Sequence, residues 1–105
     1  MNKPVKLILR WDIPPEKETE SEYFEFMVSE FIPGSNRLGL ADIQAWYTLY
    51  GNCEQILFTG IAKSEEDMRR ILGSEEWDNL QTRLTDMVNN FSRKVIANAT
   101  GGFQI

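Results

Sequence analysis

The chain has 105 residues, of which 42% are hydrophobic and 11% aromatic, which is enough apolar material for one domain with a single core and excludes a disordered chain. Its 11 basic and 16 acidic residues give a formal net charge of -5, so no excess of positive charge is available for nucleic acid or an anionic membrane surface. We therefore predict a single domain over residues 1–105 with neither of these partners.

The sequence also limits the compartment in which the protein works. No apolar run approaches the ~20 residues of a membrane-spanning helix. The apolar run near the N-terminus ends at Arg10 and is shorter than the ~7–15 apolar residues of a secretory signal. The single cysteine, Cys53, cannot form an intramolecular disulfide, so nothing requires an oxidising compartment. These features predict a cytoplasmic protein without a membrane partner.

Histidine is absent from the chain. Its absence excludes Ser-His-Asp and Cys-His catalysis, haem held by histidine, and most zinc sites, because zinc requires several His or Cys ligands. The sequence also contains no Asp-rich loop with the ligand spacing of a calcium site. We therefore expect no metal and no cofactor.

The first predicted element is a strand. Apolar residues alternate with polar ones, which is typical of a half-buried strand, at Val5, Leu7, Leu9 and Trp11. Pro14-Pro15 ends this strand, because neither proline can donate a hydrogen bond to a neighbouring strand.

A helix is predicted next. Thr19 and Glu22 have the spacing of a capping box. The residues that follow form an apolar stripe at helical spacing, made of Phe24, Met27, Val28, Phe31 and Ile32. We expect this helix to stop at Pro33-Gly34.

Residues 42–50 and 55–63 are predicted to form two further strands, joined as a hairpin by the turn residues Gly-Asn at 51–52. Ser64 and Asp67 repeat the capping-box spacing and begin a short helix that ends before Gly73. A longer helix begins at Ser74, with an apolar stripe of Trp77, Leu80, Leu84, Met87, Val88 and Phe91. Residues 94–99 read as the last strand.

This order predicts an α+β fold, namely a ferredoxin-like βαββαβ sandwich with a four-stranded antiparallel sheet and a second helical segment split in two. Alternation then divides the strand residues between two faces. The helix-facing set is Val5, Leu7, Leu9, Trp11, Ile43, Ala45, Tyr47, Leu49, Ile56, Phe58 and Ala62. The opposite face carries Ile8, Trp46, Tyr50, Leu57, Ile61 and Ile96. A solvated sheet face does not normally hold six such residues, so we predict a homodimer in which a second copy covers this face.

Two local segments add to this element order. ILGSEEWDNLQTRL contains a Ser-x-Glu-Trp helix start, and the tail ATGGFQI contains glycines. With these features the chain resembles the dimeric α+β barrel proteins, which include the antibiotic-biosynthesis monooxygenases and many uncharacterised relatives. The resemblance implies two sheets that meet face to face in a dimeric barrel, and a ligand cavity between the sheet and helices of each subunit.

The resemblance also bears on activity. It implies that enzyme members work without a cofactor, using Asn, Trp and Tyr around an aromatic substrate, while haem-degrading members add a His that this chain lacks. Arg10 or Asp12 stands where the family has an asparagine on its first strand, so the resemblance assigns no catalytic residue here.

The candidate site lies among the helix-facing aromatic residues. Their rings and few polar groups would orient an apolar or aromatic ligand in a pocket between helices and sheet, lined by Trp11, Tyr23, Tyr47, Phe58 and Trp77. Core packing is the alternative use of each of these side chains. On the other face, Arg10 and Asp12 would pair across the dimer seam or remain at its rim, whereas an Arg10 buried without a carboxylate partner would indicate an anionic ligand.

Three functions remain open from the sequence. The first is a dimer that binds a small apolar or aromatic molecule. The second is a cofactor-independent monooxygenase or isomerase that acts on such a molecule. The third is a structural or interaction dimer without a ligand. No spacing in the chain indicates a general base, so only turnover separates the first two.

Overall fold

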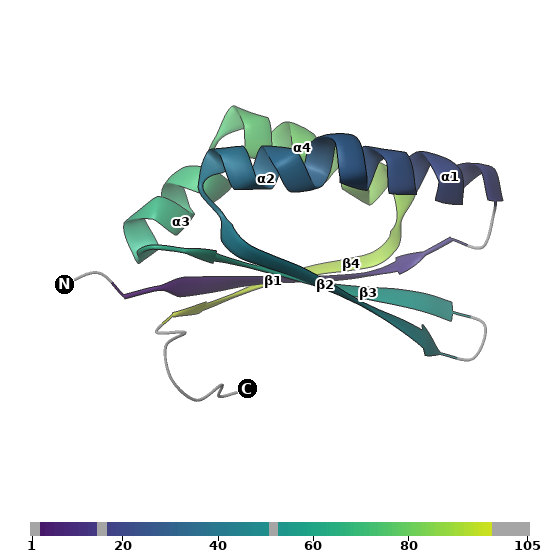
Figure 1. Cartoon of the computed structure of the whole chain (residues 1–105), viewed down its shortest axis with the longest axis horizontal. Helices are drawn as coiled ribbons and strands as arrows, with labels where there is room; N and C mark the ends of the chain where they lie inside the picture. The colour runs from purple at the N-terminus through teal and green to yellow at the C-terminus, as the bar shows by residue number, and fades with distance from the viewer. Residues whose placement is uncertain (1–2, 15–16, 51–52, 98–105) are drawn as a thin grey trace.

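The computed structural model describes residues 3–14, 17–50 and 53–97 (Figure 1). Four strands form one antiparallel sheet in the order β2-β3-β1-β4, and the helices lie together on one face of it (Figure 1). The elements, in chain order, are β1 (Val5–Ile13), α1 (Lys17–Phe26), the π-helical turn η1 (Met27–Phe31), α2 (Ile32–Leu38), β2 (Ala41–Tyr50), β3 (Cys53–Ala62), α3 (Glu65–Leu72), α4 (Glu75–Met87) and β4 (Asn89–Ala97). The predicted ferredoxin-like α+β fold is confirmed, including the second helical segment in two parts.

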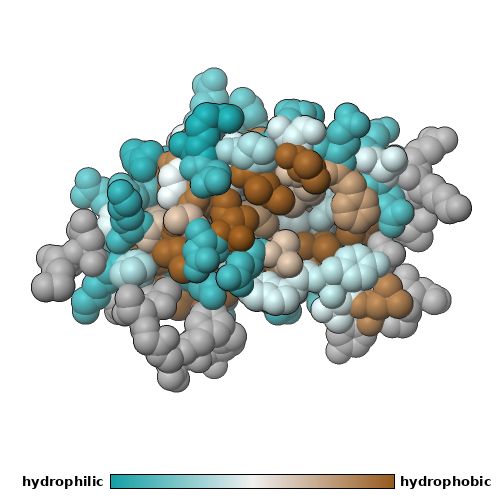
Figure 2. Space-filling view, in the orientation of Figure 1, coloured by the Kyte–Doolittle hydropathy of each residue, from teal (hydrophilic) through white to brown (hydrophobic). Residues whose placement is uncertain are grey.

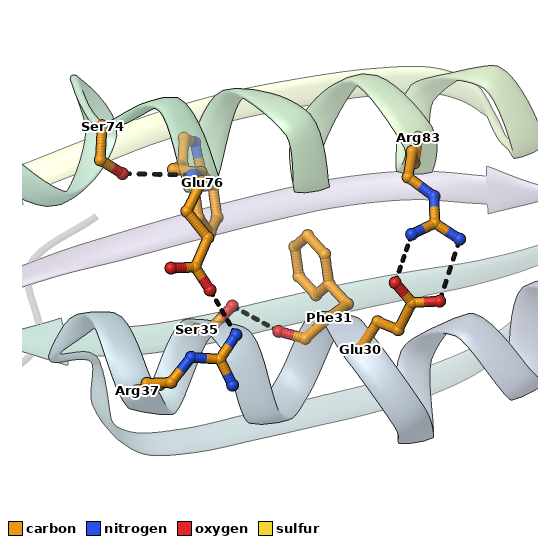
Figure 3. Close-up of polar contacts among 8 residues, drawn as sticks. Glu30, Phe31, Ser35, Arg37, Ser74, Glu76 and Arg83 are labelled. Atoms are coloured by element: carbon orange, nitrogen blue, oxygen red, sulfur yellow. Dashed lines mark hydrogen bonds and ion pairs between the residues drawn. The ribbon is translucent and has the colours of Figure 1, made fainter.

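The hairpin and the predicted starts of the last two helices are also confirmed. The first helix begins earlier than predicted, at Lys17, so Thr19 lies inside it and is not its N-cap. Tyr50 pairs with Cys53, which closes the β2–β3 hairpin. The Ser64 hydroxyl accepts a hydrogen bond from the backbone N–H of Asp67 at 3.1 Å. Ser74 caps α4 in the same way, accepting from the backbone N–H of Trp77 at 3.1 Å (Figure 3). Each hydroxyl satisfies an N–H that has no partner inside its helix.

The prediction that the first helix stops at Pro33-Gly34 is wrong. The helical path continues through η1 and α2, and it ends at Gly39, whose φ of +123° favours glycine. Pro33 is the second residue of α2, directly after the π-helical turn η1, so its missing N–H falls where the helical hydrogen-bond pattern changes. A Cβ on Gly34 would lie 2.8 Å from Cδ1 of Leu80, so the glycine allows α2 to lie close against α4.

The boundary between α4 and β4 also differs from the prediction. The helix ends at Met87 and the strand begins at Asn89, so Phe91 belongs to β4 and not to the helical stripe. Val88 is already extended, with φ of -128° and ψ of 168°, which ends the helical path. Asn90, inside β4, adopts a left-handed φ of 56°, which Asn tolerates better than most residues. Phe91 fits the apolar stripe of the sequence because its side chain still points into the core. There its ring stacks on Trp11, with 6.2 Å between the ring centroids.

The core lies between the helices and the sheet. The exposed fraction is 0% for Leu7, Leu9, Trp11, Phe31 and Phe58. Figure 2 shows hydrophilic side chains over the outer side of the helix layer and hydrophobic ones between this layer and the sheet. Two exposed ion pairs, Arg37–Glu76 and Arg83–Glu30, connect the first helical segment to α4 (Figure 3). Such exposed pairs contribute little to stability.

Two further expectations fall partly or wholly outside the described residues. The glycine-containing tail follows residue 97, and the turn at 51–52 lies in a gap of the described ranges. Within the residues that the structure describes, no helix is long and apolar enough to cross a membrane.

Candidate functional site

The face of the sheet opposite the helices is the candidate site. A hollow of about 730 Å³ lies on this face and is lined by alternate residues of all four strands. The lining residues are Lys6, Ile8, Arg10, Gln44, Trp46, Thr48, Leu57, Thr59, Lys94 and Ile96. The volume falls within the ~300–1,000 Å³ typical of small-molecule sites.

The register of the strands divides the hollow into two halves. On the β2–β3 side, Trp46 lies opposite Leu57, and Gln44 lies opposite Thr59. This half carries no charge, and the indole of Trp46 is its largest ring. Trp46 is 46% exposed, which leaves much of its side chain open to contact.

The β1–β4 half of the hollow is basic. Lys94 lies opposite Ile8, and Lys6 and Arg10 stand two residues to either side of Ile8 on the same face. No acidic side chain lines the hollow in the part of the chain that is described. Asp12 lies further along the same face of β1, and its carboxylate accepts hydrogen bonds from Gln55 Nε2 at 3.3 Å and Asn90 Nδ2 at 2.7 Å.

The two-face division of the sheet follows the prediction. Register places Ile8, Trp46, Leu57, Ile61 and Ile96 on the face away from the helices. The side chain of Tyr50, predicted for the same face, lies outside the described part of the structure. The prediction named the apolar members of this face but assigned no ligand to it.

Four of the five predicted site residues form a packed cluster between helices and sheet. Their exposed fractions are between 0% and 2%, at Trp11, Tyr23, Phe58 and Trp77. Trp11 donates a hydrogen bond from Nε1 to the Tyr23 hydroxyl at 3.0 Å, and Trp77 donates from Nε1 to Gln81 Oε1 at 3.1 Å. The polar groups expected to orient a ligand are therefore used within the chain. That these residues bind a ligand stays a prediction.

Burial of Tyr23 raises the pKa of its phenol to about 12, although the hydrogen bond from Trp11 acts in the opposite direction. The neutral phenol therefore persists through the physiological range. It stabilises the core as a hydrogen-bond acceptor and does not supply a base near neutral pH.

Tyr47, the fifth predicted residue, lies apart from this cluster. It points to the helix side of β2, as alternation predicts, but its side chain is 53% exposed. Leu49 on the same strand is 65% exposed. β2 is an edge strand, with a neighbouring strand on one side only. Tyr47 and Leu49 therefore stay exposed, although they point to the helix side of the sheet.

Sequence reasoning missed the polar members of the hollow: Lys6, Gln44, Thr48, Thr59 and Lys94. Alternation assigns them to this face, because each stands at even spacing from an apolar residue of the face on its own strand. These apolar residues are Ile8, Trp46, Leu57 and Ile96. Their grouping could not be read from alternation alone, since it depends on the register between strands.

Within the described ranges, no group of three or more Cys, Asp or Glu side chains is placed to hold a metal ion. The side chains that converge on the hollow suit an organic ligand, because they combine apolar surface, neutral hydrogen-bonding groups and cations.

No protein-family model matches the chain, and no curated protein matches it. Solved structures do. The hydroxynitrile lyase of Passiflora edulis has a TM-score of 0.74 at 6% identity, covering 97% of this chain and 99% of that one. SnoaB, a cofactor-independent oxygenase from Streptomyces nogalater, has a TM-score of 0.68 at 10% identity, covering 90% and 91%. A dimeric protein of unknown function and ferredoxin-like fold from Bacteroides fragilis has a TM-score of 0.63 at 12% identity, covering 90% and 95%.

At these identities the likeness concerns the fold alone. The chain has the ferredoxin-like α+β fold, as expected from its resemblance to the dimeric α+β barrel proteins.

Proposed function

We propose that the chain acts as a homodimer whose two helix-free sheet faces pack together, and that the hollow on this face holds a small apolar or aromatic molecule. The observation that carries the proposal is the hollow itself. It joins an exposed Trp46 to the apolar residues Ile8, Leu57 and Ile96 on a face that no helix of the described chain covers. Sheet faces of this composition are normally covered.

A second copy of the chain is the proposed cover. Twofold self-association is the commonest oligomeric arrangement, and a neighbour of the same fold is described as dimeric. Burial of each ~100 Å² of apolar surface is worth about 2.5 kcal/mol. Burial of several large apolar side chains would therefore offset the entropic cost of association.

The ligand class follows from the lining. Trp46 and Leu57 offer a flat apolar surface on which a ring would stack, while Gln44, Thr48 and Thr59 offer a few hydrogen-bonding groups at its edge. The hollow opens to solvent in one chain and would become an enclosed chamber between two.

Sedimentation and calorimetry together test the proposal. The wild-type protein should sediment as a dimer, at twice the chain mass of 12.2 kDa, at micromolar concentration. Titration with 2-naphthalenemethanol, a neutral ring probe, should release heat that is lost in Trp46→Ala and kept in Tyr47→Ala, the neighbouring residue on the other face. A monomer at ~100 µM protein would contradict the dimer, and equal binding by both variants would contradict the location of the site.

The predicted site between helices and sheet is the competing position for the same ligand. A ring there would have to separate Trp11 from Phe58, whose centroids are 6.2 Å apart and whose side chains are 0% exposed. Binding that is lost in Trp77→Leu and unchanged in Trp46→Ala would support this position over the sheet face.

A cofactor-independent monooxygenase or isomerase is the second candidate. SnoaB supports it, because that oxygenase shares the fold over 90% of this chain. Oxygen uptake measured with the protein and a naphthol tests the oxygenase form. A rate equal to that of the protein-free control would leave binding as the proposed function.

A further inference from the structure

Thr59 is a buried polar residue on the face of the sheet that carries the hollow. Its exposed fraction is 4%, and it lines the hollow from β3, a central strand with neighbours on both sides. Ser35 is the other buried serine or threonine in the described part of the chain, and its hydroxyl donates to the carbonyl oxygen of Phe31 at 2.7 Å. The hydroxyl of Ser35 is thus satisfied within the chain.

The Thr59 hydroxyl is used differently. In residues 3–14, 17–50 and 53–97, no hydrogen bond joins it to another group of the chain. Every fully buried side-chain nitrogen or oxygen atom in these ranges does have a partner. The Thr59 hydroxyl is therefore not sealed inside the chain, and it opens to the hollow that the residue lines.

The neighbours of Thr59 on the same face supply one polar group. Gln44 of β2 lies opposite Thr59 on one side, and Ile8 of β1 lies opposite it on the other. Leu57 and Ile61 stand two residues away along β3. Side chains directly opposite on adjacent strands have Cβ atoms about 4.5–5.5 Å apart, so the Gln44 amide and the Thr59 hydroxyl can bind the same group. Gln44 is exposed and makes no hydrogen bond through its side chain within the described residues.

Dimerisation makes these two polar groups more consequential. A second sheet packed on this face would close the hollow over Thr59 and Gln44 and remove bulk water from them. A buried hydroxyl or amide without a partner is costly. An ordered water needs about 2–4 polar partners, whereas three of the four neighbours of Thr59 are apolar. A polar group on the bound molecule therefore suits this position better than a water does.

Strand register also places a ring beside this polar pair. Trp46 stands two residues from Gln44 on β2, so it is the diagonal neighbour of Thr59 on the same face. Diagonal neighbours on adjacent strands are about 7–8 Å apart. An aromatic ring over Trp46 with one short polar substituent spans this distance.

We propose that the molecule held in the hollow is an aromatic carboxamide whose amide group is recognised by Thr59 and Gln44, and this inference rests on the proposed function of the hollow. The ring stacks on Trp46. The Thr59 hydroxyl donates to the carboxamide oxygen, and Gln44 Oε1 accepts from the carboxamide N–H. Gln44 ends in a planar amide with both donors and an acceptor, so a substituent that donates and accepts matches it better than one that only accepts.

A matched pair of probes, 2-naphthamide and 2-acetylnaphthalene, tests the amide group. The two share a ring system and a carbonyl, and they differ by a methyl group in place of the NH₂. In calorimetric titrations of the wild-type protein, 2-naphthamide should bind ~10-fold more tightly, because the ketone leaves Gln44 Oε1 without a donor. Gln44→Met should bind the two probes within ~2-fold of each other, since it keeps the length of the side chain and removes the amide. Equal affinity of wild type for both probes would overturn the carboxamide.

Variants of Thr59 test its hydroxyl. Thr59→Val keeps the shape of the side chain and should weaken binding of 2-naphthamide ~10-fold, whereas Thr59→Ser keeps the hydroxyl and should stay within ~3-fold of wild type. Thr82→Val is the control, because it makes the same substitution at an exposed position of α4, in the helix layer, and should change the affinity less than ~2-fold. Unchanged affinity in Thr59→Val, or an equal loss in Thr59→Val and Thr59→Ser, would overturn recognition by the hydroxyl.

Sedimentation of the same samples separates this inference from the proposed function. A dimer that binds both probes equally overturns the carboxamide and leaves the proposed function in place. A protein that stays monomeric with and without either probe overturns the proposed dimer and the inference with it. A dimer that prefers 2-naphthamide, and loses this preference in Gln44→Met, supports both.

Discussion

The two faces of the sheet use the same kinds of side chain in opposite ways. Trp11 on the helix side is 0% exposed, donates a hydrogen bond to Tyr23 and contacts the rings of Tyr23, Phe31, Phe58 and Phe91. Trp46 on the other side is 46% exposed beside a hollow. One face uses its rings and polar groups within the chain, and the other leaves its tryptophan partly exposed. The second face is therefore the one with side chains left to contact another molecule.

The largest expected effect comes from truncating a large side chain on the packed face of the sheet. Phe58→Ala should lower the free energy of unfolding by about 3–5 kcal/mol, because it leaves a cavity beside Trp11 and Phe31. Leu57 directly precedes Phe58 and lies on the open face. Leu57→Ala should lower the free energy of unfolding much less, when measured at protein concentrations where the chain is monomeric. Urea unfolding of both variants measures the difference. Equal losses would mean that the two faces are not packed differently.

An alkaline titration probes the same packed face through Tyr23. Its pKa rises from 10.0 to about 12 on folding, because burial disfavours the phenolate. The unfolded chain therefore loses this proton first, so the stabilising contribution is complete below pH 10 and is lost as pH rises from 10 to 12. The loss should be about 2–3 kcal/mol.

Tyr23→Phe provides the control for this titration. At neutral pH it should cost about 1 kcal/mol, since Trp11 Nε1 loses its acceptor. Unfolding measured at steps from pH 9 to pH 12 should show a steeper fall for wild type than for the variant. Parallel curves would place Tyr23 in a more hydrated environment than the structure does.

The third prediction concerns the open face and its partner. Trp46→Ala should raise the dimer dissociation constant about 30-fold, the effect of removing a central aromatic contact. Tyr47→Ala should change it less than about 3-fold, although Tyr47 is equally aromatic and 53% exposed. Sedimentation equilibrium of the two variants gives both constants. A larger effect at Tyr47 would assign the interface to the helix side of β2.

Much of the fold could be predicted because local signals agreed with it. Alternation at Val5 to Trp11, the caps at Ser64 and Ser74 and the turn after Tyr50 each depend on neighbouring residues alone. The end of the first helix could not be predicted in this way. Pro33-Gly34 is a strong local stop signal, but packing of Gly34 against Leu80, a residue distant in sequence, holds the helical path beyond it.

The candidate site was less accessible to sequence reasoning. Aromatic residues drew attention to Trp11 and Trp77, yet the same apolar character that suits a ligand also fills a core. The hollow combines residues whose meaning depends on register, such as Lys94 beside Lys6 and Arg10. Alternation assigns each of them to a face, but only the pairing of β1 with β4 shows that three cations lie together.

Hydroxyl-radical footprinting at Trp46 and Tyr47 tests most directly whether the helix-free face of the sheet is the surface through which the chain dimerises. The two residues are adjacent, similarly reactive and similarly exposed in a single chain, at 46% and 53%, but they point to opposite faces. As protein concentration rises through the dimer dissociation constant, oxidation of Trp46 should fall several-fold while oxidation of Tyr47 stays constant. Equal oxidation of both residues at every concentration, or protection of Tyr47 alone, would contradict the assignment of function to this face.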